Sequence, residues 1–90
     1  MKFHIEWLQS ALDELNVIWL EATSQQRKAI TAASHAVDKR LPINPDEQGE
    51  SRPKGRRIAF FPPLGVTFRV DAQNAVVVVI HVWCFRQHDT

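Results

Sequence analysis

The pattern of hydrophobic and polar positions in the first forty residues predicts a short strand followed by two helices. Between residues 2 and 8 apolar and polar residues alternate, which is typical of a half-buried strand. Ser10 and Asp13 form a capping-box pattern, after which apolar residues recur every three or four positions as in an amphipathic helix. The stripe expected to face the core consists of Leu8, Leu12, Leu15, Trp19 and Ala22.

A second helix is expected to begin near Thr23 and Ser24, which break the first helix and can cap the next. Its apolar stripe consists of Ile30, Ala33, Val37 and, one turn further, Leu41. Pro42 disfavours helical geometry at the residue before it and therefore ends the helix. Because the link between the two helices is so short, we expect them to pack as an antiparallel hairpin.

The second half of the chain reads as a loop and three strands. Residues 42–55 contain three prolines and two glycines, so a long loop is expected there. Strand patterns follow from about Arg56 to Pro62-Pro63, over residues 64–70, and over residues 75–85. The last run is apolar on both faces for most of its length, which is typical of a central strand. We expect the first strand to lie on its free side.

These elements predict one α+β domain over residues 1–90, with the order β-α-α-β-β-β. The last three strands would form an antiparallel meander within a four-stranded sheet, and the helix hairpin would pack on one face of it. The opposite face has no local element to cover it. We therefore expect the side chains on that face to decide the function.

Charge is distributed unevenly along the chain, although the net charge is only +1. Residues 39–70 hold seven Lys and Arg residues against three acidic ones. If residues 51–57 are extended, Arg52, Lys54 and Arg56 project to one side at a spacing of about 6.6–6.8 Å, near the repeat of a single-stranded phosphate backbone. This favours an anion-binding role, and the alternative is a solvated strand edge that cations protect from pairing.

Other residues with functional chemistry have two interpretations each. Arg69 either faces a ligand groove together with Arg56 or Arg86, or pairs with a surface carboxylate. His81 interrupts the apolar strand, so it is either a hydrogen-bonded structural residue or a catalytic acid or base. Arg86 and His88 either supply a charge clamp and a proton donor, or belong to a frayed terminus.

The sequence indicates no metal, cofactor or membrane segment. No pair of the four histidines has zinc-ligand spacing, and Cys84 is the single cysteine, which excludes an intrachain disulfide. We interpret Cys84 as a small buried hydrophobic residue and expect a cytoplasmic protein. The longest apolar run covers about eleven residues, whereas a membrane helix needs roughly 20. Phosphate-binding glycine loops and nucleophile motifs are absent from the sequence.

Taken in order, several motifs resemble those of the RelE/ParE superfamily, the toxins of type II toxin–antitoxin systems. The resemblance covers nearly the whole chain, and the ordered combination is more specific than any single motif. The motifs are Trp7 ahead of residues 11–15 (Ala-Leu-Asp-Glu-Leu), Ile18-Trp19, residues 27–31 (Arg-Lys-Ala-Ile-Thr), residues 37–41 (Val-Asp-Lys-Arg-Leu), Asn44-Pro45, residues 49–52 (Gly-Glu-Ser-Arg), Arg57, residues 63–70 (Pro-Leu-Gly-Val-Thr-Phe-Arg-Val) and residues 76–82.

The resemblance implies a small toxin that is encoded beside a cognate antitoxin, which neutralises it by wrapping its surface. Members that resemble RelE cut mRNA on the ribosome without a metal. They hold the scissile phosphate with lysine and arginine, and often use a tyrosine or histidine near the C-terminus. Members that resemble ParE poison DNA gyrase and are not nucleases. The resemblance therefore implies two different targets, mRNA on the ribosome or DNA gyrase.

On this pattern the catalytic candidates are Arg56, Arg57, Arg86 and His88. Arg56 or Arg57 matches a basic position on the strand before the middle one, Arg86 matches the C-terminal arginine, and His88 stands in for a tyrosine, which this chain lacks. Gly65 lies three residues before Phe68, where ribonuclease members commonly carry an arginine. The sequence therefore leaves three functions open: a metal-independent endoribonuclease, a gyrase poison, and a non-catalytic or decayed toxin that only binds its antitoxin.

Overall fold

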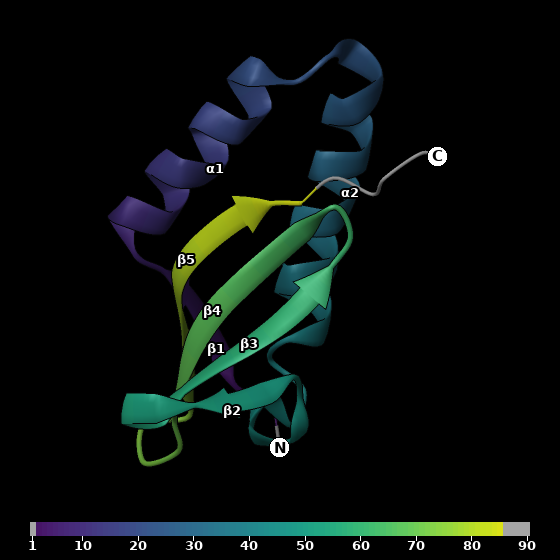
Figure 1. Ribbon diagram of the computed structural model, residues 1–90. Coiled ribbons are helices and arrows are strands. Elements are labelled where there is room, and N and C mark those ends of the chain that lie inside the picture. The colour runs from purple at the N-terminus through teal and green to yellow at the C-terminus, as the bar shows by residue number, and fades with distance from the viewer. Residues whose placement is uncertain (1, 86–90) are drawn as a thin grey trace.

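The computed structural model describes residues 2–85, which form one five-stranded sheet with two α-helices against one face (Figure 1). The strand order is β1-β5-β4-β3-β2; β1 runs parallel to β5, and the other neighbours are antiparallel. The expected element order is confirmed apart from one additional strand, and β5 lies inside the sheet with β1 on its free side as expected, although β4 is the middle strand. The elements are β1 (His4–Trp7), α1 (Gln9–Glu21), α2 (Ser24–Arg40), β2 (Glu50–Arg52), β3 (Arg56–Phe61), β4 (Leu64–Asp71) and β5 (Val76–Cys84).

Strand β2 is an addition to the four strands that the sequence predicts. It lies within residues 42–55, where we expected only a loop, because its three residues are all exposed and show no apolar alternation. The turn Pro53–Gly55 reverses the chain, since both Lys54 and Gly55 have a positive φ. The cationic segment is therefore a hairpin of β2 and β3 and not one extended strand.

Helix α2 follows the sequence pattern closely. Thr23 accepts a hydrogen bond from the Gln26 N–H at 3.2 Å, and the Gln26 side chain accepts one from the Thr23 N–H at 2.9 Å, which completes a capping box. The expected stripe of Ile30, Ala33 and Val37 is buried, together with Leu41. Lys39 and Arg40 occupy the last turn, where cations are favourable to the helix dipole.

Helix α1 differs from expectation in both its start and its buried side. It begins at Gln9 without a side-chain cap, and Asp13 accepts a hydrogen bond from the Gln9 side chain instead of completing a box with Ser10. Leu12 and Trp19 are 42% and 39% exposed, so the prediction that they cover the sheet is wrong.

The buried side of α1 is centred on Ala11, with Leu15, Ile18 and Ala22 partly buried beside it. Apolar residues lie on several sides of this helix, so spacing alone could not identify the inner one. The small side chain of Ala11 instead fills the position between α1 and the sheet.

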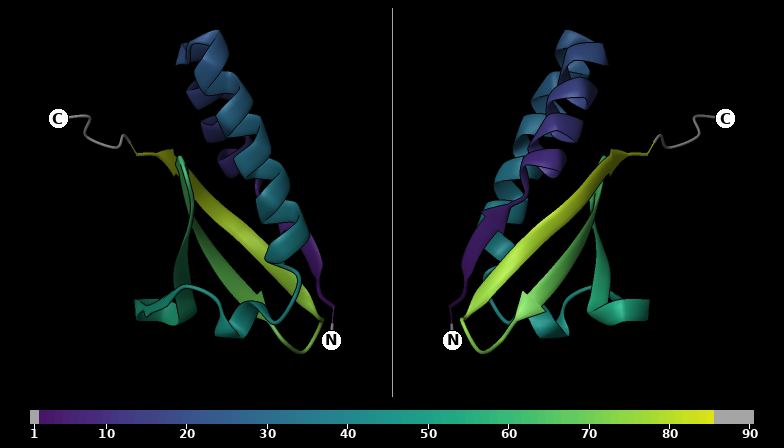
Figure 2. Two further views of the ribbon diagram at one scale, coloured as in Figure 1. Left: turned by 90° about the vertical axis from the view of Figure 1, so that its right-hand side faces the viewer. Right: turned by 90° about the vertical axis from the view of Figure 1, so that its left-hand side faces the viewer.

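The core lies between the helices and one face of the sheet. Its fully buried members are Ala11, Val37, Leu41, Leu64, Val66, Phe68, Val77 and Val79. The helix hairpin leans away from the sheet toward the link between its helices, so the two layers diverge at that end (Figure 2). Cys84 lies near that end and is exposed, which corrects the prediction that it is buried.

A register shift in β5 places one extra residue opposite β4. Thr67 pairs with His81 and Phe68 pairs with Val79, so Ile80 is the bulged residue.

No helix within residues 2–85 is long and apolar enough to cross a membrane.

Candidate anion-binding site

Three arginines lie opposite one another on three neighbouring strands. Arg52 of β2 pairs with Arg56 of β3, and Arg56 pairs with Arg69 of β4. Residues that are directly opposite in antiparallel strands have Cβ atoms about 4.5–5.5 Å apart and point to the same face. We call these three residues the guanidinium row. Their register places Arg69 on the same face as Arg56, which is the arrangement that the first interpretation of Arg69 requires.

The guanidinium row lies on the face of the sheet that the helices leave open. Phe68 is fully buried under the helices, and Arg69 follows it on the strand, so Arg69 points to the other side. All three arginines of the row are exposed. The face that has no covering element is therefore the one that carries aligned positive charges.

Only one member of the row has a carboxylate partner within residues 2–85. Arg52 Nη2 lies 3.0 Å from Glu50 Oε2, whereas the side chains of Arg56 and Arg69 form no hydrogen bond or ion pair with the described part of the chain. Like charges placed directly opposite each other on a sheet are destabilising. An anion bound between Arg56 and Arg69 would offset this repulsion, which makes the pair a candidate phosphate site.

Asp71 follows the row on β4 but is held by its own turn. Its carboxylate accepts hydrogen bonds from the Asn74 side-chain amide at 2.9 Å and the Asn74 backbone N–H at 3.2 Å. These bonds, together with the positive charge of Arg69, keep the pKa of Asp71 below its usual range. Asp71 is therefore mainly a turn residue, and it only partly balances the charge of Arg69.

An aromatic cluster lies on the same face at the other end of the strands. Phe60 is 56% exposed, and its ring meets Trp83 and Phe85 edge-on, with centroids 6.3 and 5.6 Å away. Phe60 follows Arg56 by four residues on β3, which separates the two groups by about 13 Å. The open face thus combines positive charge with exposed aromatic surface.

Trp83 also explains why position 65 carries no side chain. Gly65 and Trp83 are cross-strand partners, and a Cβ atom added at Gly65 would lie 2.4 Å from the indole ring. The indole therefore occupies the space into which a side chain at position 65 would project. The glycine that stands where ribonuclease members carry an arginine has a packing reason in this chain.

The remaining candidates are not brought together with the row. Arg57 points to the helix-covered side, where its guanidinium donates hydrogen bonds to the Gln48 carbonyl at 2.8 Å and the Gly49 carbonyl at 3.3 Å, and so holds the preceding loop. Lys54 lies in the turn between β2 and β3. Arg86 and His88 lie outside the described residues.

His81 is half exposed, and its Nδ1 lies 3.4 Å from Glu14 Oε1 on helix α1. This contact agrees with the structural interpretation of His81 as a hydrogen-bonded residue. Within residues 2–85, no cluster of three or more His, Cys, Asp or Glu side chains is arranged to hold a metal ion.

The aromatic part of the site was not predicted from the sequence. Phe60 alternates with buried Ala59 and Phe61, so strand periodicity already placed it on the same side as Arg56 and Ile58. The exposure of Phe60 could not be predicted from the sequence, because it depends on whether another element covers this face of the sheet.

Comparison with known proteins finds similar folds among solved toxin–antitoxin structures. No family model and no curated protein matches the sequence. Among solved structures, the chromosomal ParDE toxin–antitoxin system from P. aeruginosa matches with a TM-score of 0.75 and 18% identity, over 94% of this chain and 98% of that one. The RelBE2 toxin–antitoxin complex from Mycobacterium tuberculosis matches with a TM-score of 0.73 and 16% identity, over 93% and 92%.

A more distant match is the archaeal RelE–RelB complex from Pyrococcus horikoshii, with a TM-score of 0.54 and 10% identity over 98% of this chain and 100% of that one. These identities are low, whereas the superposed lengths are nearly complete. The chain therefore shares its fold with the matched chains of these ParDE, RelBE2 and RelE–RelB structures.

Proposed function

We propose that this protein is the toxin of a type II toxin–antitoxin system and that a cognate antitoxin neutralises it. The observation that carries the proposal is the match to the ParDE and RelBE2 structures over more than nine tenths of both chains. The match includes the helix hairpin and the sheet, so it is not limited to a common substructure. The toxin would arrest growth in a cell that lacks the antitoxin.

The guanidinium row supports mRNA on the ribosome as the target. Arg56 and Arg69 present two positive charges without carboxylate partners in the described chain, and cations at this spacing can stabilise charge that develops on a scissile phosphate. Exposed aromatic residues on the same face suit an unpaired base, because every base has a face that stacks.

A different observation supports DNA gyrase as the target. The Trp83 indole fills the space next to Gly65, so an arginine cannot project there as it does in ribonuclease members. A toxin without that side chain would act by binding and not by cleavage. The second candidate function is therefore a non-catalytic gyrase poison.

Induced expression in a bacterium without the antitoxin tests the proposal directly. We expect growth arrest that is relieved when the neighbouring gene is co-expressed. Mapping of mRNA ends in a translating extract and a gyrase supercoiling assay then separate the two targets. New mRNA ends support the ribonuclease, and trapped cleaved DNA supports the gyrase poison.

A matched pair of variants connects the outcome to the guanidinium row. Arg56→Ala with Arg69→Ala removes the two unpaired charges, whereas Lys28→Ala with Lys39→Ala removes two exposed charges of α2. We expect only substitution of the first pair to abolish toxicity.

A third outcome is that cells expressing the wild-type chain grow normally, while the chain still forms a stable complex with the neighbouring gene product. This outcome would mean a decayed toxin that only binds its antitoxin.

A further inference from the structure

Strand β5 extends beyond its neighbour β1 and leaves one edge without a partner strand. β1 pairs with β5 over Val76–Val79, and the last contact is the Leu8 N–H, which donates to the Val79 carbonyl at 3.0 Å. The chain then turns into helix α1. From Ile80 to Cys84, β5 has β4 on one side and no strand of residues 2–85 on the other.

The hydrogen bonds identify which main-chain groups lie on that free edge. The Phe85 N–H donates to the Pro63 carbonyl at 3.0 Å, so the main-chain groups of Phe85 point toward the β4 side. In an antiparallel pair the direction alternates from one residue to the next, so the groups of Cys84 and Val82 point outward. The Val82 N–H confirms this, because it donates to Glu14 Oε1 at 3.3 Å.

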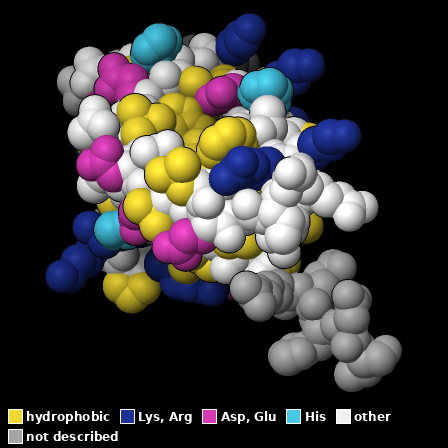
Figure 3. All heavy atoms as spheres, turned by 90° about the horizontal axis from the view of Figure 1, so that it is seen from above, with side chains coloured by type: hydrophobic (Ala, Val, Ile, Leu, Met, Phe, Trp, Pro, Cys, Tyr) yellow, Lys and Arg dark blue, Asp and Glu magenta, His cyan; other side chains and the backbone are white. Residues whose placement is uncertain are grey.

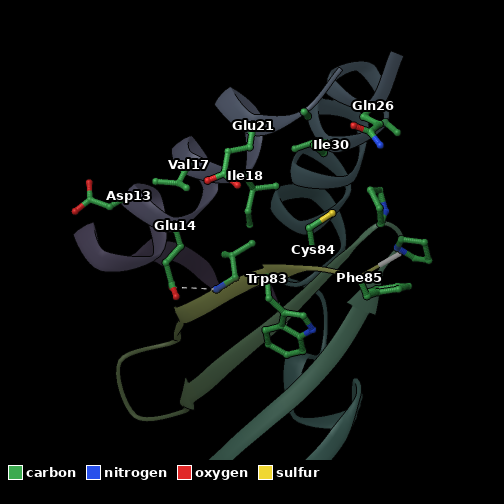
Figure 4. Close-up of a pocket in the computed structure, with 15 residues that line it drawn as sticks. Asp13, Glu14, Val17, Ile18, Glu21, Gln26, Ile30, Trp83, Cys84 and Phe85 are labelled. Atoms are coloured by element: carbon green, nitrogen blue, oxygen red, sulfur yellow. Dashed lines mark hydrogen bonds between the residues drawn. The ribbon is translucent and has the colours of Figure 1, made fainter. Parts of the chain in front are cut away.

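The free edge opens into a groove of about 1050 Å³ between the helix hairpin and the end of β5 (Figure 4). Val17 and Ile18 of α1 and Ile30 of α2 give it apolar walls. Asp13, Glu14 and Glu21 also line it, and seen from this end the acidic side chains lie beside the hydrophobic ones (Figure 3). The groove thus joins apolar surface, negative charge and an unpaired strand edge.

We propose that this edge receives an extended segment of another protein chain, which adds to the sheet beside β5, and that Glu14 caps the edge until then. The Glu14 carboxylate occupies the position that a main-chain carbonyl of an added strand would take (Figure 4). Strand addition satisfies the outward groups of Val82 and Cys84, which a docked helix cannot do because its own main chain is already paired.

The charges specify the chemistry of the segment. When the segment displaces Glu14 from the Val82 N–H, the carboxylate loses that donor and keeps only its 3.4 Å contact with His81 Nδ1 in a partly desolvated place. A lysine or arginine of the segment would supply a new partner, and Asp13 and Glu21 add to the attraction. The segment is therefore extended, alternately apolar and basic. This inference does not depend on the protein being a toxin.

Amide hydrogen exchange of the full chain tests the cap. We expect Glu14→Ala to speed exchange of the Val82 amide about fivefold, since one hydrogen bond is lost, and Glu14→Gln to preserve most of the protection. Asp13→Ala is the matched control, because it removes a neighbouring acid that contacts Gln9 and not the strand. Amides of β5 that pair with β1 report whether the variants remain folded. If Val82 exchanges at the wild-type rate in Glu14→Ala, Glu14 is no cap and the proposal fails.

A synthetic peptide tests the docking edge. The probe is an eight-residue peptide that alternates valine with lysine, and its control carries N-methyl groups on every second amide, which block strand pairing. We expect the first peptide to shift the amide resonances of Val82 to Phe85 and the control to bind at least tenfold more weakly. Glu14→Lys should weaken the first peptide to a similar extent.

Three results would overturn the docking proposal. The first is no shift of these resonances at millimolar peptide. The second is equal binding of both peptides, which would mean that the occupant is not a strand. The third is a concentration-dependent dimer of the wild-type chain through this edge, which would make a second copy the occupant.

Discussion

The two faces of the sheet differ in what they contribute, although they alternate residue by residue along the same strands. On the helix-covered face Phe68 is 0% exposed and packs within an apolar core, whereas the next residue, Arg69, is exposed and belongs to the guanidinium row. One face supplies the free energy of folding and the other supplies charge for a ligand. Stability and binding should therefore be separable by substitutions at adjacent positions.

The largest effect is expected for Phe68→Ala, which should lower the free energy of unfolding by about 3–5 kcal/mol through lost burial and a cavity. Denaturant titration measures this. Trp19→Ala is the comparison within α1, and because Trp19 is 39% exposed we expect a loss of only about 1–2 kcal/mol. Equal losses at the two positions would mean that Trp19 belongs to the core after all.

Gly65→Ala should cost about 1–3 kcal/mol, because its Cβ would meet the Trp83 indole and force that ring to move. Trp83 fluorescence and the unfolding midpoint should change together. Gly55→Ala is the control: it meets no atom within 4 Å, so its cost comes from the positive φ of 71° alone. Gly55→Ala should therefore leave the tryptophan emission unchanged.

The double variant Arg56→Ala with Arg69→Ala should change stability by less than about 0.5 kcal/mol, since exposed charges contribute little. It should weaken binding of a single-stranded RNA oligonucleotide and reduce the slope of log K against log salt by about 1.4, which corresponds to two phosphate contacts. Fluorescence anisotropy between 50 and 200 mM salt measures both.

Arg57→Ala provides the contrast for the guanidinium row. Its guanidinium holds the Gln48 and Gly49 carbonyls on the other side of the sheet, so the salt slope should stay at the wild-type value. A slope that falls equally in both proteins would contradict the division of roles between the two faces.

The smallest expected effect is a change in how the stability of the fold depends on pH, through Asp71. Because the folded-state pKa of Asp71 lies below its usual value of 3.8, ionised Asp71 stabilises the fold above that pH. This contribution is lost as the pH falls below about 4 toward the folded-state pKa. Asp71→Asn should therefore show a shallower decline in stability between pH 5 and 3 than the wild type, as measured by thermal unfolding. Indistinguishable declines would mean that the turn bonds of Asp71 add no stability.

The sequence predicted the elements whose buried side follows from the local apolar pattern. It did not predict those whose buried side depends on contacts with distant parts of the chain. The apolar run of β5 and the single stripe of α2 have one consistent solution, and both were predicted. Helix α1 is apolar on several sides, so its rotation depends on which side chain fits the sheet, and Ala11 was not recognisable as that residue.

The candidate site divides in the same way. Strand alternation places Arg56 and Arg69 on one side, and this parity is visible in the sequence. The alignment of Arg52 with Arg56 depends on the turn at Pro53–Gly55, where two residues adopt a positive φ, and only the structure shows it. Strand alternation also separates Arg57 from Arg56, although the charge pattern alone groups them.

The bulge at Ile80 determines which neighbouring groups can form hydrogen bonds with β5. Before the bulge, the carbonyls of Ala75 and Val79 accept hydrogen bonds from the N–H groups of His4 and Leu8, in and directly after β1. After the bulge, the even-numbered residues and not the odd-numbered ones turn their main-chain groups to this edge, and the N–H of Val82 donates to Glu14. A deletion of Ile80 would make Val79 and His81 consecutive in a regular strand, so Val82 would still face the helices and Trp83 the open face. A regular strand that kept all of these residues would instead turn Trp83 toward the helices and Val82 away from them. The extra residue thus shifts the alternation of the strand and lets its two halves fit two different environments.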